Sequence, residues 1–188
     1  MTRARAVENL NCADALSAAA ARILAVRLNE LRERQGAIGG PEDSVALHDL
    51  RIAAKRLRYS LEMFALCFPP KQAESFADRV REMQDTLGRL HDLDVLHALL
   101  GAELERMDET RRRRELEVAG QIAEETERSA ALRRMMKDRK SEAERLGLLE
   151  VIAAKLQERQ ACYDRYRALW SEWDENGLLD EIGARIAS

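Results

Sequence analysis

The chain has 188 residues and a formal net charge of −3 at pH 7, from 31 Lys and Arg against 34 Asp and Glu. That length fits one domain, or one domain with an extension, and is long enough to bury a core. The slightly acidic balance argues against a general nucleic-acid-binding protein, because such domains are usually basic overall, but it leaves room for a local anion site. Charged residues make up 35% and aromatic residues 4%, a composition typical of long amphipathic helices.

The sequence also indicates the expected compartment. No stretch of about 18 apolar residues occurs, so no transmembrane segment is expected. Asp14 and Arg22 interrupt the N-terminal Ala-rich stretch, which makes it a poor signal-peptide core. The three cysteines show no CxxC spacing, as is typical of reduced thiols in a cytosolic protein. We therefore expect a cytoplasmic location.

Apolar residues recur at three- and four-residue spacing along most of the chain, the pattern of amphipathic helices. Five long helices are expected, over residues 8–35, about 42–67, 71–100, 102–145 and 148–175, followed by a short amphipathic tail. The breaks are Gly39-Gly40-Pro41 and Pro69-Pro70, because the residue before a proline disfavours the helical region. The sequence predicts an all-α fold, an antiparallel helical bundle, with residues 1–188 in a single domain.

The last two helices differ in character. Residues 102–145 are the most charged part of the chain, so a partly solvated helix with a break near Gly120 is expected. The consecutive arginines Arg111–Arg114 circle a helix and have flanking glutamates, which favours a solvated belt of salt bridges. The last helix carries a seam with 3-4 spacing that is typical of bundles and coiled coils. It consists of Leu149, Ile152, Leu156, Tyr163, Tyr166, Trp170 and Trp173, with Arg159 filling one position.

The second helix carries the most informative segment. It concentrates five cationic or proton-sharing side chains, namely His48, Arg51, Lys55, Arg56 and Arg58. All except Arg56 form a cationic row, because spacings of three, four and three residues place them within an arc of about 80°. Few acidic side chains lie at helical spacing from this row, and only Glu62 is well placed. A basic helix face is often simply solvated, but such a row repels itself unless an anion lies among its members.

These residue types suit a chain of phosphate groups. An arginine presents a planar fork to two phosphate oxygens, a lysine adds a point charge, and a histidine gains charge at lower pH. Neighbouring members of the row lie about 4.5–6 Å apart along a helix axis, so they can engage nearby phosphates. A second set of cations shares a face of the fourth helix and is a candidate second wall for the same ligand: Arg133, Lys137 and Lys140.

Two motifs in the second and third helices resemble the CHAD family, the conserved-histidine α-helical domain. They are His48-x-x-Arg51-x-x-x-Lys55-Arg56-x-Arg58-Tyr59 and Gln84-Asp-Thr-Leu87-Gly88-Arg-Leu-His91-Asp92-Leu-Asp94-Val95-Leu96. The resemblance covers about residues 40–100 and implies a helical bundle with a basic groove that binds inorganic polyphosphate. The binding residues it implies are His48, Arg51, Lys55, Arg56 and Arg58, with Tyr59 and Asp92 in supporting positions.

The chain departs from the family pattern in two ways. CHAD proteins usually carry two copies of the basic helix, whereas no second His-x-x-Arg follows Arg58. His91 also stands where one family pattern has arginine. A homodimer that faces two copies of the basic helix across a two-fold axis would restore a two-sided groove, and we expect one.

No P-loop, nucleophile elbow or carboxylate cluster with metal spacing occurs, so neither catalysis nor a cofactor is expected. The predicted function is non-catalytic binding of inorganic polyphosphate or another polyanion, with polyphosphate granules as one cellular site. In crystals, phosphate or sulfate ions are expected to occupy the same site. Two alternatives stay open, a helical interaction or scaffold protein and a nucleic-acid-binding bundle. A weaker one is a metal site at His91, Asp94 and His97, of which only two share a helix face.

Overall fold

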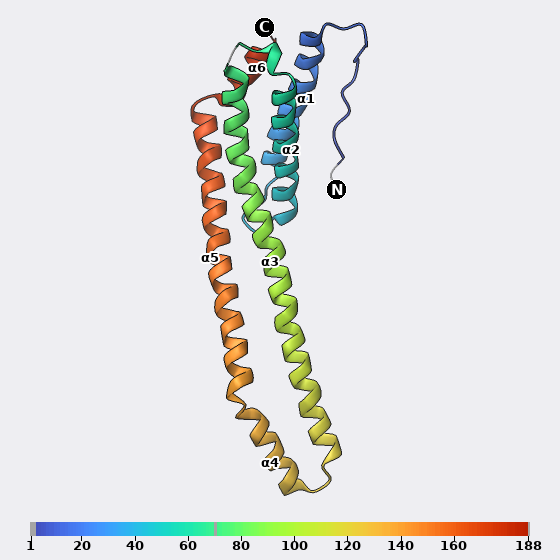
Figure 1. The fold of residues 1–188 in the computed structure, drawn as a ribbon, viewed down its shortest axis with the longest axis vertical. Helices are drawn as coiled ribbons and strands as arrows, with labels where there is room; N and C mark the ends of the chain where they lie inside the picture. Colours follow the sequence, from blue (N-terminus) through green and yellow to red (C-terminus); the bar gives the residue numbers. More distant parts are fainter. Residues whose placement is uncertain (1–2, 70, 188) are drawn as a thin grey trace. The chain divides into compact units, whose positions relative to one another are not determined.

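The computed structural model describes residues 3–69 and 71–187, which form helices joined by short connections (Figure 1). In chain order the elements are α1 (Leu16–Gly36), α2 (Ser44–Met63), the 3-10 helix η1 (Ala65–Cys67), α3 (Gln72–Gln121), α4 (Glu125–Met136), α5 (Arg139–Glu175) and α6 (Leu178–Ala187). The described residues contain no strand, so the predicted all-α fold is confirmed. None of the helices in this part of the chain has both the length and the apolar character that a membrane span requires.

The first two helices are shorter than the sequence predicts. α1 begins at Leu16 rather than at residue 8. In the segment before it, the backbone N–H of Arg5 donates to Glu30 and the backbone carbonyl of Asn9 accepts from Arg22, so these groups bond to side chains of α1 and not within a helix. α2 ends at Met63, and the chain tightens into the 3-10 turn of η1 before Pro69. Pro70, part of the predicted stop, lies outside the described residues.

The third and fifth helices are longer than predicted. α3 continues through Gly101, since one glycine costs only about 1 kcal/mol in a helix interior. It ends at Gln121, so the predicted break near Gly120 is confirmed. α5 already begins at Arg139 and ends before Gly177, whose φ of 61° is a left-handed conformation that glycine adopts without strain.

Contacts divide the chain into two compact units. The first contains the described residues up to Asp92 and from Gln160 onward, and so holds α1, α2, α6, the start of α3 and the end of α5. Its core is built from the apolar stripes of these helices, including Leu24, Leu28, Leu50, Leu57, Leu61, Val80, Met83, Tyr166, Trp173 and Ile182. The four aromatic residues of the predicted α5 seam therefore pack within this chain. Burying each of these side chains contributes about 1.5–3 kcal/mol to the stability of the fold.

The same core orients α2. The helix is capped by Asp43, whose carboxylate accepts a hydrogen bond from the backbone N–H of Ala46 at 3.1 Å. Its apolar side chains Leu47, Leu50, Ala54, Leu57 and Leu61 are at most 2% exposed. Because this stripe faces the core, the cationic row lies at the border between the buried and the solvated sides of the helix.

The second unit, Leu93–Arg159, contains several charge pairs between α3 and α5. Along increasing residue number in α3 and decreasing residue number in α5, these pairs join Asp94 to Arg159 at 2.5 Å, Asp108 to Arg145 at 2.9 Å, and Arg111 to Glu142. This order is that of antiparallel helices. Of the predicted salt-bridge belt, Arg111 pairs with Glu115 at 3.0 Å and Arg112 with Glu109 at 3.2 Å. The Asp94 carboxylate also explains why Arg159, only 6% exposed, fills a position of the α5 seam.

Candidate functional site: a cationic row on α2 beside α3

The basic side chains of α2 lie along a seam with α3 in the first unit. The rings of His48 and His91 have centroids 4.7 Å apart and an interplanar angle of 46°. One turn further, a Cβ added to Gly88 would lie 3.7 Å from Arg51 Nε, so Arg51 crosses α3 where α3 has no side chain. Moving three residues forward along α2, from His48 to Arg51, corresponds to moving three residues back along α3, from His91 to Gly88. The two helices are therefore antiparallel here.

Continuing this register brings a second arginine into the seam. On this register we expect Lys55 near Gln84 and Arg58 near Arg81. The Glu62 carboxylate confirms the register, because its Oε1 lies 3.7 Å from Arg58 Nη1 and 3.2 Å from Arg81 Nη2. Sequence reasoning missed Arg81, since nothing in its local pattern differs from an ordinary surface arginine. Only the pairing of α2 with α3 reveals its position.

Tyr59 lies next to the basic side chains as predicted. Its ring centroid is 4.5 Å from the Arg58 Cζ and 5.7 Å from the Lys55 Nζ, so the ring supports both cations from one side. The Lys55 side chain is exposed, whereas the Arg58 side chain is 14% exposed. The ring thus restricts two cationic groups at the end of the row.

Acidic partners are scarce along the row. Within the described residues, neither Arg51 nor Lys55 forms an ion pair, and Arg58 has only the 3.7 Å contact with Glu62. The second unit differs, because most of its arginines that form pairs do so at hydrogen-bond distance. The cationic row therefore keeps charge that an external anion can neutralise.

Buried polar atoms without partners gather along the same seam. Among the described residues they include His48 Nδ1, Arg51 Nε, Arg58 Nε and Gln84 Oε1. Such atoms are uncommon in native proteins, and each costs about 1–3 kcal/mol. Three of these atoms belong to the cationic row, so the row keeps hydrogen-bonding capacity that the protein itself does not use.

Arg56 lies on a different face from the row. Its Nη1 is 3.6 Å from Oε1 of Glu30 on α1, a carboxylate only 6% exposed. Glu30 also pairs with Arg27 and accepts a hydrogen bond from the Arg5 backbone N–H at 2.6 Å. Arg56 therefore contributes to the packing of α1 on α2. A binding role for it stays a prediction.

Other predicted residues are not brought into the row. Asp92 is exposed on α3, and no contact among the described residues joins it to Arg51 or Arg58. The basic set Arg133, Lys137 and Lys140 is exposed in the second unit, but the prediction that it shares one helix face is wrong, because α4 ends at Met136 and α5 begins at Arg139. A binding role for these residues stays a prediction.

The proposed metal ligands do not form a cluster. Asp94 pairs with Arg159, and His97 is exposed. In residues 3–69 and 71–187, no three or more His, Cys, Asp or Glu side chains are arranged to hold a metal ion. The His91 ring instead packs at a tilt against the His48 ring, which gives His91 a place in the seam between α2 and α3.

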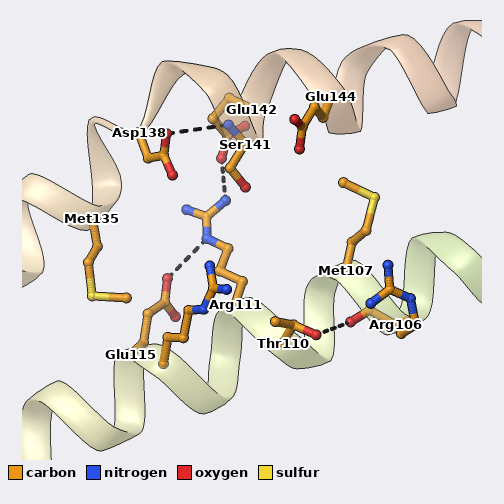
Figure 2. A pocket seen from close by; sticks show the side chains of 11 residues that line it. Arg106, Met107, Thr110, Arg111, Glu115, Met135, Asp138, Ser141, Glu142 and Glu144 are labelled. Atoms are coloured by element: carbon orange, nitrogen blue, oxygen red, sulfur yellow. Dashed lines mark hydrogen bonds and ion pairs between the residues drawn. The ribbon is translucent and has the colours of Figure 1, made fainter.

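The second unit contains a hollow of about 350 Å³ that could compete as a site (Figure 2). Figure 2 shows the Arg111 guanidinium pointing between Glu115 and Glu142, and hydrogen bonds with both raise the pKa of Arg111. Arg106 is likewise engaged by Glu103 at 2.5 Å. Arg114 also lines the hollow, but Arg106 and Arg111 are already paired with carboxylates, whereas Arg51 and Lys55 on α2 have no carboxylate partner among the described residues. The hollow therefore suits a polyanion less well than the row on α2.

His48 makes the row sensitive to pH. Burial lowers the pKa of His48 below its usual 6.5, and the neighbouring His91 and Arg51 lower it further, against a smaller effect of Asp49. The folded protein therefore binds fewer protons at His48 than the unfolded chain does. Its stability should fall as the pH drops through about 6.5, because the unfolded state gains the proton first.

A bound polyanion should reverse the shift in the pKa of His48. We expect affinity for the polyanion to rise as the pH is lowered from about 7.5 to about 5.5, since the imidazolium then adds a charge to the row. Calorimetry in two buffers of different ionisation enthalpy would measure the accompanying proton uptake. The His48→Gln variant should lose most of that uptake, and equal uptake by this variant would contradict the assignment.

Comparison with known proteins gives one match. The family model described as the CHAD domain matches residues 3–101, which is more than half of the chain and includes both motifs of the α2–α3 seam. No curated protein and no solved structure matches the chain. The matched segment holds α1, α2 and α3 as far as Gly101, the same helices that position the cationic row. The chain therefore belongs to the CHAD domain family.

Proposed function

We propose that this protein binds inorganic polyphosphate along the cationic row of α2, without catalysing a reaction. The observation that carries the proposal is that Arg51 and Lys55 have no carboxylate partner among the described residues, although 34 acidic residues occur in the sequence. Regularly spaced cations at one helix edge suit a ligand with a regularly repeated charge. Arginine forks can each take two phosphate oxygens, and the lysine adds a mobile charge.

Nucleic acid is the less favoured ligand. Single-stranded nucleic acids are bound by basic grooves combined with exposed aromatic side chains on which bases stack. Here the α5 aromatics Tyr163, Tyr166, Trp170 and Trp173 are at most 8% exposed and belong to the core. Tyr59 is exposed, but its ring already lies against Arg58. A ligand made of phosphates alone needs only the cations.

A homodimer remains part of the proposal. One basic helix per chain supplies one side of the groove usual in the family, and a second copy would supply the other. The α5 seam no longer argues for this assembly, because its aromatic half packs inside the chain. The case for a dimer therefore depends on the single motif copy.

Calorimetry with long-chain polyphosphate tests the proposed function. We expect saturable binding whose log–log dependence on salt concentration has a slope of about −3, by analogy with four charges neutralised on a single-stranded nucleic acid. RNA at equal phosphate concentration should bind more weakly. Light scattering during the same titration would report whether two copies assemble. Binding of RNA as tight as that of polyphosphate, or no binding of either, would contradict the proposal.

A further inference from the structure

The Glu62 carboxylate lies between two guanidinium groups that come from different helices. Its Oε1 is 3.7 Å from Nη1 of Arg58 on α2 and 3.2 Å from Nη2 of Arg81 on α3. A single carboxylate oxygen is thus shared by two cations. Arg81 Nη1 also donates a hydrogen bond to Asp78 at 2.6 Å, which holds Arg81 toward this position from its own helix.

Arg58 does not depend on Glu62 for its position. Its side chain is 14% exposed, its Nε is buried without a hydrogen-bond partner, and its guanidinium packs on the Tyr59 ring at 4.5 Å. The Glu62 and Arg81 side chains, by contrast, are 38% and 46% exposed. Ion pairs with this degree of exposure contribute little to stability, so the carboxylate can leave at small cost.

A phosphate group fits this arrangement better than a carboxylate does. A phosphate group has more oxygens than a carboxylate, and one arginine can donate hydrogen bonds to two of them at once in a bidentate geometry. Two arginines that approach one oxygen from separate helices could each engage a different phosphate oxygen. Arg81 would also extend the cationic row from α2 onto the neighbouring helix α3, on the same side of the proposed groove.

We propose that Arg58 and Arg81 form a subsite for one phosphate group of the polyanion, and that Glu62 is an internal competitor that occupies this subsite in the free protein. The inference rests on the proposed function and adds Arg81 and Glu62 to it. Polyphosphate must displace the Glu62 carboxylate before both arginines can bind phosphate. Glu62 thereby sets the affinity of the row and selects for ligands with higher charge density than a carboxylate.

Two substitutions in the full chain test this inference by calorimetry with long-chain polyphosphate. The Glu62→Gln variant should bind roughly three- to tenfold more tightly than the wild type. It removes a carboxylate that competes with phosphate for the two arginines and that repels the polyanion. The Arg81→Gln variant should bind more weakly and reduce the magnitude of the salt slope by about one. In the Arg81→Gln background, Glu62→Gln should have a smaller effect, because one of the two cations it occupies is gone.

Asp174→Asn is the matched control. Asp174 is exposed on α5 and forms no ion pair among the described residues, so this variant removes the same charge away from the seam. If Glu62→Gln gains no more affinity than Asp174→Asn, or if Arg81→Gln leaves affinity and salt slope unchanged, the inference is overturned while the proposed function stands. A wild-type protein that binds no polyphosphate overturns both.

Discussion

Replacing Arg51, Lys55 and Arg58 together by alanine is expected to weaken the binding of long-chain polyphosphate by about two orders of magnitude or more, because each contributes a charge-assisted phosphate contact. The magnitude of the salt slope should fall from about 3 to about 1, since three of the four neutralised charges are lost. Calorimetry across a salt series measures both quantities. Helix content, measured by circular dichroism, should stay close to that of the wild type.

Two controls make this result specific. Arg112, Arg113 and Arg114 lie on the solvated part of α3 in the second unit, and their replacement by alanine removes the same formal charge. A glutamine version of the first variant retains more of the packing of Arg51 over Gly88. If the α3 control loses as much affinity as the α2 variant, then binding depends on total charge and the assignment of the row is wrong.

Replacing Glu30 by alanine is expected to lower the free energy of unfolding of the first unit by about 2–4 kcal/mol, because it leaves buried cations without their carboxylate. Glu30 bonds to Arg27, Arg56 and the backbone of Arg5. The side chains of Arg27 and Arg56 are only 11% and 24% exposed. Urea unfolding followed by tryptophan fluorescence measures the effect, since Trp170 and Trp173 both lie in this unit.

The polyphosphate affinity of folded Glu30→Ala should stay within about threefold of the wild type, because the row keeps all its members. Glu33→Ala is the control on the same helix, where the carboxylate is 57% exposed and pairs with Arg5. Its stability should change by less than about 1 kcal/mol. Equal stability of the two variants would contradict the role of the Glu30 pairs in packing α1 on α2.

The helices and the cationic row were predictable from local patterns. A period of 3.6 residues places His48, Arg51, Lys55 and Arg58 on one face of α2 whatever packs against it. The break near Gly120 and the end of α5 at Gly177 follow from similarly local rules. Errors occurred where a longer helix competes with a local breaker, as at Gly101, because one unfavourable residue is outweighed by the hydrogen bonds on either side.

The identity of each cation's partner was not predictable in this way. Arg56 is adjacent in sequence to Lys55, yet it pairs with Glu30 on α1, whereas Arg81 joins the row from α3. These pairings depend on how segments far apart in the chain align, and many registers satisfy the same hydrophobic pattern. The aromatic residues of α5 illustrate the same point, since their spacing fits either a dimer seam or an internal core.

By itself, then, the sequence determined that the chain is helical, that it carries a row of cations on one helix, and that this row resembles that of the CHAD family. The packing of the helices was needed to learn which of these cations have acidic partners, and that Glu62 lies between Arg58 and Arg81. The reason is physical. Helix periodicity is a property of neighbouring residues, whereas the neutralisation of a charge depends on side chains brought within a few ångströms from distant segments.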